Sequence, residues 1–541
     1  MATASHETLP FGGPGEGLAG LPEVPVLSVE QAGHLRHIDN LSRLPRGDWR
    51  LMAPSMPLQE DFSAYRYQLG YMSMALGLAH MHRLPAAPVV FQRTLDRLIH
   101  KMLEVDTWWY WRDTSTAGGY GPLDLPRLPS RTDPVAVDNI MYSAYLQVMT
   151  LQYTMLFDDR TYEQPGSLSF DVYPVLWGRD RREVFRYDQR SLNERIYWNM
   201  VSNGYLGVAC EPFCVFQMCN QVPILGFRLH DHLYGGDTAT EVTQGYVRAW
   251  EDFGGGFNER GHFIKNIIQR NDMLPKDYVV DNDSAWTDGW LGMLMNMWRP
   301  ELIRRTYRDK IGHWVEPTDA GTLTVTQVGM LPDSQKIQAP GGLGELGWLA
   351  GWASEMGDEE VLSGLLAHAD TFMNPQWENG GLYYPRRDDT YDEAGRFVAM
   401  PPITSNAMLP YARLNVPDGL RKLYEQPWTE RERSRPALTG LSDGVDVRRA
   451  WYDEDTKSLQ LAFSPVHGSS TSTARLTISR IGSAPWSLFV DGRAVANGHG
   501  STAEPTDGAA RFEPRASGDT VELTVPLDGE LTAVDMVWGL A

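Results

Sequence analysis

The segment YQLGYMSMALGLAHMH, residues 67–82, has apolar residues that recur at spacings of three and four positions. This spacing places them on common faces of an α-helix and predicts a helix here. The pattern returns in VVFQRTLDRLIHKML (89–103) and NIMYSAYLQVMTLQYTMLF (139–157). Further helices are predicted at LNERIYWNMVSNG (192–204), CVFQMCNQVPILGFRLHDHL (214–233), TQGYVRAWEDF (243–253), HFIKNIIQR (262–270), SAWTDGWLGMLMNMW (284–298), PELIRRTYRDKI (300–311), GLGELGWLAGWASEM (342–356), EEVLSGLLAHADTFM (359–373) and ITSNAMLPYARLNV (403–416).

About a dozen consecutive helices with short connections favour six stacked hairpins, an (α/α)6 barrel, over residues 46–430. A helix bundle and a solenoid are the alternatives, although no repeat of about 20–50 residues is visible. Residues 1–45 are rich in Gly and Pro and are expected to form an irregular N-terminal arm. From about residue 440 the apolar pattern changes to a period of two, broken by DG and NG turns, which predicts an antiparallel β-sandwich over residues 431–541.

Composition excludes several classes of function. The 541 residues are 42% hydrophobic and 22% charged, as in an ordinary globular protein. The net charge of −21, without a basic patch to offset it, disfavours nucleic acid and anionic membranes as partners. No run of about 18 apolar residues predicts a membrane span. The first residues lack the pattern of a secretory signal, so a cytoplasmic location is expected.

All three cysteines of the chain, Cys210, Cys214 and Cys219, lie within the segment GVACEPFCVFQMCNQ (207–221). Their spacing is not that of a zinc knuckle, and no fourth ligand lies nearby in the sequence. Two hypotheses remain: three buried thiols that pack as small hydrophobic groups, or thiols that serve a site. Glu211 followed by Pro212 favours a turn that faces a cavity.

Two pairs of closely spaced histidines are candidates for a metal site. His80/His82 and His230/His232 have a spacing of two, which on a helix turns the side chains about 200° apart and argues against a shared metal ion. The chain has no nucleotide-binding loop, so neither a metal nor an organic cofactor is predicted.

The segment DFSAYRYQLGY (61–71) combines a carboxylate with several phenols. Asp61 lies where a helix could begin, so it could simply be an N-cap. Tyr67 and Tyr71 share a helix face, and Tyr65 lies on another. A phenol beside a carboxylate can also relay a proton.

Four stretches together resemble the linalool dehydratase/isomerase family over most of residues 45–425. They are DFSAYRYQLGYMSMALGLAHMHRLPAAP (61–88), DNIMYSAY (138–145), NGYLGVACEPFCVFQMCN (203–220) and NGGLYYPRR (379–387). The resemblance implies a cofactor-free enzyme on an (α/α)6 barrel that acts on a small apolar alcohol or alkene. The family's catalytic cysteine pair falls on Cys210 and Cys219, and its Asp/Tyr pair falls on Asp61 and Tyr67.

The resemblance also implies that Asp61 and Tyr67 enter the site from a neighbouring subunit, so a homo-oligomeric ring is expected. A family histidine is absent from DNIMYSAY, where Tyr142 or Tyr145 stands instead, and Cys214 and the β domain are additional to the family pattern. The substrate is therefore expected to be an allylic terpene alcohol like linalool or geraniol, or a longer homologue. The residues expected to surround it are Tyr65, Tyr142, Tyr145, Glu211, Trp286 and Tyr383.

The expected chemistry explains why thiols would gather in one place. Removal of water from an allylic alcohol needs an acid for the hydroxyl, a base for a carbon-bound proton, and an apolar pocket for an allylic cation. A buried thiol stays protonated and can supply the acid, or can form a transient thioether.

Two other classes of function remain as alternatives. One is a carbohydrate-active (α/α)6 hydrolase or epimerase with a carboxylate pair among Asp281, Asp283, Asp288, Glu345 and Glu378. The other is a non-catalytic binding or scaffold protein, which would tolerate changes at all these positions.

Overall fold

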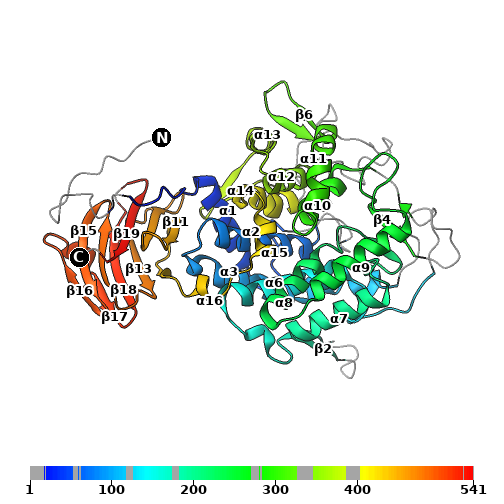
Figure 1. The fold of residues 1–541 in the computed structure, drawn as a ribbon, viewed down its shortest axis with the longest axis horizontal. Coiled ribbons are helices and arrows are strands. Elements are labelled where there is room, and N and C mark those ends of the chain that lie inside the picture. Colours follow the sequence, from blue (N-terminus) through cyan, green and yellow to red (C-terminus); the bar gives the residue numbers. More distant parts are fainter. Residues whose placement is uncertain are drawn as a thin grey trace.

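The computed structural model describes residues 18, 20–52, 59, 63–116, 126–173, 182–269, 279–280, 283–325, 345–385, 402–527 and 529–539. The helices lie between Val29 and Arg433, and a region of antiparallel strands follows from Ala437 to Trp538. Figure 1 shows the two regions side by side, with the strands of the C-terminal region at one end of the molecule and the helices at the other.

The main helices are α1 (Val29–Ser42), α2 (Tyr65–His82), α3 (Pro88–Met102), α6 (Ile140–Phe157), α7 (Gln189–Ser202), α8 (Val222–Tyr234), α9 (Thr238–Phe253), α10 (Ala285–Met295), α11 (Pro300–Trp314), α12 (Glu345–Met356), α13 (Glu359–Phe372) and α14 (Leu409–Leu414). Shorter helices are α4 (Val105–Trp108), α5 (Trp111–Thr114), α15 (Gly419–Glu425) and α16 (Glu430–Arg433), and a π-helical segment, Thr404–Met408, leads into α14. The predicted helices at 67–82, 89–103 and 139–157 are confirmed as α2, α3 and α6.

Several long helices form the interior of the helical region that the structure describes. Nearly every residue of α2, α6 and α10 is buried, as expected for helices that are apolar on all sides. Helix α2 packs on α6 and α14, α6 on α8, and α12 on α10 and α14. Helices α3, α7, α9, α11 and α13 each follow one of these helices in the chain and pack against it from outside.

Small residues allow the interior helices to approach closely. A Cβ atom added at Gly70 of α2 would lie 2.3 Å from Cδ1 of Tyr145 on α6. A Cβ atom at Gly292 of α10 would lie 2.2 Å from Trp352 of α12. These glycines therefore let large aromatic side chains fill the space between neighbouring helices.

The C-terminal region consists of two antiparallel sheets. The first has the strand order β10-β13-β18-β17 and the second has the order β11-β12-β19-β14-β15-β16. Their strands are β10 (Ala437–Leu441), β11 (Val445–Asp453), β12 (Ser458–Pro465), β13 (Thr473–Ser479), β14 (Pro485–Val490), β15 (Arg493–His499), β16 (Thr502–Pro505), β17 (Arg515–Ser517), β18 (Thr520–Pro526) and β19 (Thr532–Trp538). Strand β10 packs on α3 and β11 contacts α1, which joins this region to the helices.

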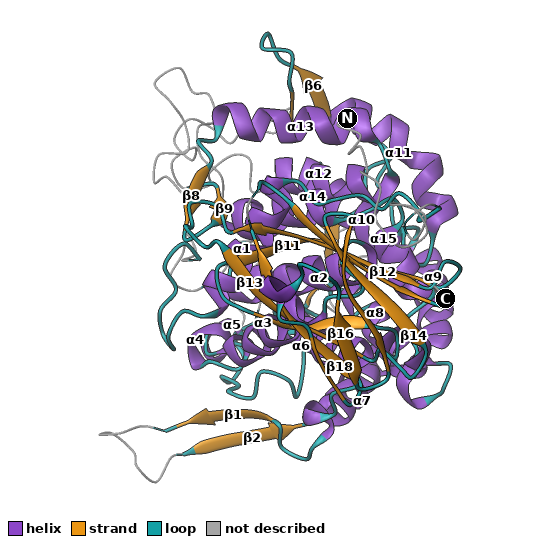
Figure 2. Ribbon diagram, turned by 90° about the vertical axis from the view of Figure 1, so that its left-hand side faces the viewer, coloured by secondary structure: helices purple, strands orange, loops and turns teal. Residues whose placement is uncertain are grey.

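Short strands also occur among the helices. They are β1 (Leu168–Val172), β2 (Glu183–Tyr187), β3 (Cys214–Phe216), β4 (Asn266–Ile268), β5 (Val279–Val280), β6 (Val315–Pro317), β7 (Leu323–Val325), β8 (Gln376–Glu378) and β9 (Gly381–Tyr383). Figure 2 shows the β1–β2 hairpin extending away from the helices. Strands β3, β4 and β5 form a small antiparallel sheet.

Three predictions from the sequence are wrong in detail. Residues 1–45 were expected to be irregular, but Ser28 caps α1 through a capping box with Gln31, and α1 buries Leu35 and Ile38. The helix predicted over 214–233 begins only at Val222, because residues 214–216 pair with β4 instead. The helix predicted at 262–270 does not form in the described residues of that range; Asn266–Ile268 form strand β4 instead, and Ile267 and Ile268 are β-branched residues that suit a buried strand.

In the parts of the chain that the structure describes, none of the helices has the length and apolar character needed to cross a membrane.

Candidate active site

Cys210 and Cys214 face each other across a tight turn. The backbone N–H of Cys210 donates to the carbonyl of Cys214 at 2.8 Å, and the N–H of Cys214 donates to the carbonyl of Glu211 at 2.9 Å. Phe213 has a φ of 73°, in the left-handed region that non-glycine residues seldom adopt. The sequence Glu-Pro-Phe therefore forms a strained turn, after which Cys214 begins strand β3.

Asn220 holds the other end of this segment. Its side-chain oxygen accepts from the N–H of Val208 at 2.7 Å, and its side-chain nitrogen donates to the carbonyls of Val208 and Phe216 at 3.0 and 2.8 Å. A Cβ atom at Gly207 would lie 2.8 Å from the amide carbon of Asn220, so glycine is needed for this approach. These bonds fold residues 207–220 back on themselves and return Cys219 to the vicinity of Cys210.

The start of α6 anchors Cys210. Asp138 and Asn139 both have positive φ values, 57° and 58°, which is unfavourable for two consecutive non-glycine residues. In this conformation the backbone N–H of Asn139 donates to the carbonyl of Cys210 at 3.1 Å. Tyr110 donates its hydroxyl to the side-chain oxygen of Asn139 at 2.6 Å. The stretch DNIMYSAY therefore positions the cysteine segment through its backbone.

All three cysteines are buried as free thiols. Burial raises the pKa of Cys210 well above its ordinary value, and the neighbouring Cys219 and the charge of Glu211 raise it further. Burial and Glu211 also raise the pKa of Cys214. Cys210 is therefore a neutral thiol at neutral pH, in the state that can donate a proton.

Aromatic rings from four interior helices lie beside the thiols. The ring of Tyr67 meets Tyr145 and Trp290 edge to face, with centroid distances of 5.6 Å in both cases. Trp290 stacks on Trp348 at 4.2 Å with an interplanar angle of 10°. Tyr71 packs edge to face on Trp348 at 4.8 Å. These rings form an aromatic cluster contributed by α2, α6, α10 and α12.

Tyr67 links the aromatic cluster to the thiols. Burial raises its pKa well above the ordinary value, and the proximity of Cys219, Cys210 and Glu211 raises it further, while Arg66 lowers it. The expectation that Tyr67 enters the site of a neighbouring subunit stays a prediction. Within its own chain the side chain is 4% exposed and packs edge to face on Tyr145 of α6.

The other predicted residues divide into two groups. Tyr145 belongs to the aromatic cluster, Glu211 lies near both Cys210 and Cys214, and Trp286 packs on Trp290 at 6.2 Å. The remaining tyrosines have structural contacts elsewhere: Tyr142 donates to the carbonyl of Met102 at 2.7 Å, Tyr65 stacks on Trp49 at 4.1 Å, and Tyr383 stacks on His37 at 5.2 Å. Asp61 lies outside the described residues.

The histidine pairs have separate surroundings. His80 is sandwiched between Phe91 and Phe157, whereas His82 bonds through Nε2 to the carbonyl of Gly419 at 3.0 Å. His232 bonds to the carbonyl of Trp428 at 2.8 Å, and His230 packs on Tyr234. The described residues contain no group of three His, Cys, Asp or Glu side chains that could hold a metal ion together.

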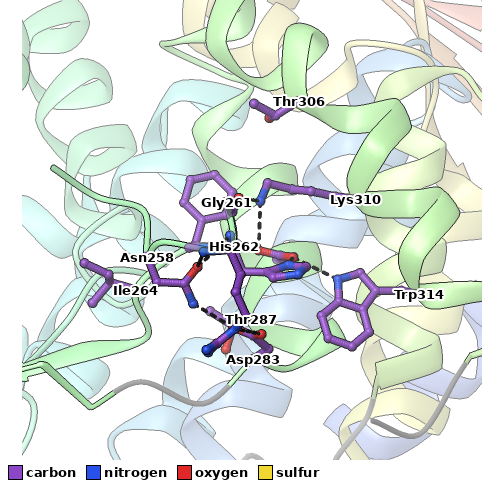
Figure 3. Close-up of polar contacts among 12 residues, drawn as sticks. Asn258, Gly261, His262, Ile264, Asp283, Thr287, Thr306, Lys310 and Trp314 are labelled. Carbon is purple, nitrogen blue, oxygen red and sulfur yellow. Dashed lines mark hydrogen bonds and ion pairs between the residues drawn. The ribbon is translucent and has the colours of Figure 1, made fainter.

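The carboxylate Asp288, a candidate for the carbohydrate-active alternative, is saturated by donors. It accepts from His262 Nδ1 at 2.6 Å, Trp314 Nε1 at 2.8 Å and the backbone N–H of Phe263 at 3.0 Å, and Lys310 Nζ lies 3.5 Å away. Figure 3 shows Lys310 and Trp314 reaching from α11 toward His262. Asp288 is fully buried, so these bonds indicate a structural role.

The other carboxylates of that alternative do not supply an evident pair. Asp283 accepts from Asn258 at 2.7 Å and forms an ion pair with Arg260. Glu378 is exposed at the edge of strand β8. Asp281 and the side chain of Glu345 lie outside the described residues.

Sequence reasoning missed four residues of the site: Arg66, Tyr110, Trp290 and Trp348. Trp290 and Trp348 sit in glycine-rich apolar helices, where a tryptophan looks like ordinary core. Arg66 had a clearer signal, because it is the one charged residue in the stretch from Ser63 to Ala79. Its guanidinium lies over the rings of Tyr110 and Tyr67, at 4.0 and 4.6 Å.

Among solved structures, similar chains include a family 76 glycoside hydrolase (mannosidase) from Bacteroides thetaiotaomicron, with 8% identity and a TM-score of 0.37 over 73% of this chain and 98% of that chain. An unsaturated glucuronyl hydrolase specific for heparin has 8% identity and a TM-score of 0.40 over 73% and 96%. The endoglucanase CelQ from Clostridium thermocellum has 10% identity and a TM-score of 0.35 over 95% and 93%. Similarities this low carry no argument about the reaction.

The family comparison is specific. The family model described as linalool dehydratase/isomerase matches residues 66–390, more than half of the 541-residue chain. The matched segment begins one residue before Tyr67 and contains Cys210, Cys219, Tyr145 and Trp290. The chain belongs to the linalool dehydratase/isomerase family.

Proposed function

We propose that the protein is a lyase and isomerase that removes water from, adds water to, and isomerises allylic terpene alcohols of the linalool and geraniol type or longer homologues. The observation that carries this proposal is the burial of Cys210 and Cys219 beside Tyr67 and an aromatic cluster, in a chain of this family. The groups needed for acid–base chemistry on an uncharged alcohol are thus side chains of the protein.

In the proposed dehydration, a protonated thiol of the cysteine pair gives its proton to the substrate hydroxyl. The C–O bond breaks with its electron pair leaving on oxygen, so that water and an allylic cation form. A base then takes a proton from the carbon next to the cation, and the C–H electron pair becomes the new double bond. Hydration runs through the same steps in reverse.

Isomerisation follows from the same cation. Its positive charge is shared between the two ends of the allyl unit, so water can return to the other end and convert a tertiary alcohol into a primary one. The faces of Tyr67, Tyr145 and Trp290 would stabilise the cation by about 0.5–2 kcal/mol each. A site of buried rings would also exclude bulk water, which would otherwise capture the cation without selectivity.

The roles are assigned as follows. Cys210, whose pKa is raised, suits the acid, and Cys219 is its partner in proton transfer or the nucleophile of a transient thioether. Tyr67 relays protons between the thiols and a base. Asp61, which the family resemblance pairs with Tyr67, is the proposed base, and the homo-oligomeric ring likewise remains a proposal.

We also infer that α2, α6, α8, α10, α12 and α14 close an (α/α)6 barrel, with the site at its centre. The packing of α2 on both α6 and α14, and of α12 on both α10 and α14, supports this closure. The two C-terminal sheets would stack as a β-sandwich, because β13 and β18 of the first sheet alternate buried and less buried residues and β12 and β19 of the second sheet are almost wholly buried.

The experiment that tests the proposal is incubation of the purified protein with alkenols of five, ten and fifteen carbons, followed by gas chromatography of the products. A panel of oligosaccharides is incubated in parallel. Conversion of an allylic alcohol to an alkene or to its allylic isomer is the expected result. Cleavage of an oligosaccharide with no change in any alkenol would contradict the proposal.

A further inference from the structure

Arg66 is a fully buried cation beside the proposed catalytic groups. Its side chain lies on α2 directly before Tyr67 and has a relative exposure of 1%. The guanidinium carbon lies 4.0 Å from the ring centroid of Tyr110 and 4.6 Å from that of Tyr67. Its Nη2 lies 3.4 Å from the sulfur of Met141, a weak hydrogen bond, and its side chain also hydrogen-bonds to Tyr67.

The charge of Arg66 is compensated only in part. Its Nε and Nη1 atoms have no hydrogen-bond partner, while the nearby charge of Glu211 and the hydrogen bond to Tyr67 raise the pKa of Arg66 above its ordinary value. A buried charge is normally paired, because removal from water is costly. The two aromatic faces repay only part of this cost. A guanidinium buried this deeply in an interior helix, with two of its nitrogens unpaired, therefore calls for a reason beyond packing.

The surrounding groups supply that reason. The pKa of Tyr67 is shifted by the nearby Cys219, Cys210 and Glu211, and by the charge of Arg66. The pKa of Tyr110 is shifted by Arg66, Glu211 and Cys210. The pKa of Cys210 is raised by its neighbours Cys219, Glu211 and Cys214. Each of these groups is either a carboxylate or becomes an anion on losing a proton. Arg66 is the cation that the described structure places among them.

We propose that Arg66 is a positioning residue whose charge compensates the negative charge left on the thiol–phenol cluster of Cys210, Cys219 and Tyr67 when that cluster gives up a proton. This inference rests on the proposed function and assigns the electrostatic part of it. The anion left behind by a buried acid has no water to solvate it, so a fixed cation close by makes the proton transfer easier. Arginine suits the position because it stays charged when buried and stacks on aromatic faces.

The test measures thiol reactivity in the absence of any substrate. The native protein is treated with iodoacetamide at a series of pH values, and alkylation of Cys210 is followed by peptide mass spectrometry. Thiolate is the reacting form, so the rate at a fixed alkaline pH reports the pKa of Cys210. Replacing the cation in Arg66→Met should raise the pKa of Cys210 by about one to three pH units and lower its alkylation rate about tenfold or more at pH 9.

Two further variants keep the test informative if Arg66→Met does not fold. Arg66→Lys retains the charge and should keep alkylation within a few-fold of the native rate. Glu211→Gln removes a nearby negative charge and should change the rate in the opposite direction, raising it severalfold at the same pH. An alkylation rate in Arg66→Met equal to that of the native protein would overturn the proposal. An alkylation rate that falls equally in Arg66→Lys and Arg66→Met would also overturn it.

Turnover separates this inference from the proposed function. With an alkenol substrate, Arg66→Met should lower kcat by at least tenfold with little change in KM, since the charge acts when the acid ionises. If the native protein converts no alkenol but alkylation responds to charge as described, the proposed function fails and the electrostatic role of Arg66 stands. If alkenols are converted and alkylation ignores the charge at position 66, the function stands and the role of Arg66 is refuted.

Discussion

The rings of Tyr67 and Tyr145 meet edge to face, with centroids 5.6 Å apart and planes at 86°. Tyr145 stands in the stretch where the family resemblance led us to expect a histidine, and its hydroxyl lies 3.4 Å from that of Tyr71. A phenol whose pKa is raised well above its ordinary value by burial cannot act as a base at neutral pH as an imidazole can. Burial raises the pKa of Tyr67 in the same way, so neither phenol is a free base at neutral pH. We assign the proton relay to Tyr67 because the family resemblance pairs it with Asp61, and we assign Tyr145 to the aromatic cluster.

Removing single hydroxyls tests this division of roles. Tyr67→Phe should lower kcat for alkenol conversion by about 10²–10⁴-fold, because a positioned proton-transfer group is lost while the ring remains. Tyr145→Phe keeps its ring against Tyr67 and should lower kcat by less than about tenfold, the range of a weak hydrogen bond. Steady-state kinetics on both variants checks this. A larger loss in Tyr145→Phe than in Tyr67→Phe would show that Tyr145 carries the proton.

The contact between α2 and α6 should be sensitive to one methyl group. In Gly70→Ala the new Cβ would lie 2.3 Å from Tyr145, so a helix or the ring must move, at a cost of about 1–3 kcal/mol of folding free energy. The matched control is Gly312→Ala in α11, where nothing lies within 4 Å and the better helix propensity of alanine should stabilise by up to about 1 kcal/mol. Thermal unfolding followed by circular dichroism measures both. Equal and small changes in the unfolding temperatures of Gly70→Ala and Gly312→Ala would show that the helices are not in tight contact at Gly70.

Stability should fall with rising pH through the thiols. The folded-state pKa values of Cys210 and Cys214 are raised by burial, whereas an unfolded thiol titrates near about 8.5. Above that pH the unfolded chain releases protons that the folded chain retains, so the free energy of unfolding decreases. The slope is about 1.4 kcal/mol per pH unit for each such thiol, and the full contribution is present below about pH 8.

Denaturant unfolding of the native protein, Cys210→Ala and Cys214→Ala between pH 7 and 10 measures this slope. Each variant should show a shallower loss of stability than the native protein. A native stability that is constant up to pH 10 would mean that the thiols are not shielded from water.

Asp288 offers a test of the carbohydrate-active alternative. In Asp288→Ala the buried His262 loses its hydrogen-bond partner and Lys310 loses its negatively charged neighbour, and breaking such a buried pair should destabilise the fold by about 3–5 kcal/mol. Asp288→Asn retains an oxygen acceptor and should lose less stability. Alkenol turnover per folded molecule should change little in Asp288→Asn. If Asp288→Asn folds with native stability but has lost all turnover, Asp288 would be a candidate catalytic carboxylate again.

The sequence predicted the long interior helices well, but it did not predict the strands of three residues or the N-terminal helix α1. The apolar period over 67–82 and 139–157 was sufficient to predict both helices, because α2 and α6 are uninterrupted interior helices. The residues 214–216 and 266–268 were misassigned as helix, because each strand is only three residues long and gains its hydrogen bonds from the other, which is distant in sequence. Helix α1 was missed because it lies beyond a Gly- and Pro-rich stretch that dominates the local composition.

The candidate site was predictable where chemistry clusters in the sequence. The three cysteines within ten positions and the phenols of 65–71 pointed to Cys210, Cys219 and Tyr67. Arg66 and Trp290 were not identified, since their importance depends on contacts with Tyr110, Tyr67 and Trp348 that only the packing of separate helices creates. The contribution of Tyr67 to a neighbouring subunit comes from the resemblance alone and stays a prediction.

The central claim is that Cys210 and Cys219 perform the chemistry, and single substitutions of the three buried cysteines test it most directly. Cys214→Ala is the matched control, because Cys214 is as buried as Cys210 and belongs to the same segment, so its removal costs similar packing. Each variant is incubated with the preferred alkenol, and products are quantified by gas chromatography, with circular dichroism to verify folding. We expect Cys210→Ala and Cys219→Ala to lose at least about 10²-fold in kcat while Cys214→Ala stays within a few-fold of the native protein. Native turnover in folded Cys210→Ala and Cys219→Ala would contradict the account.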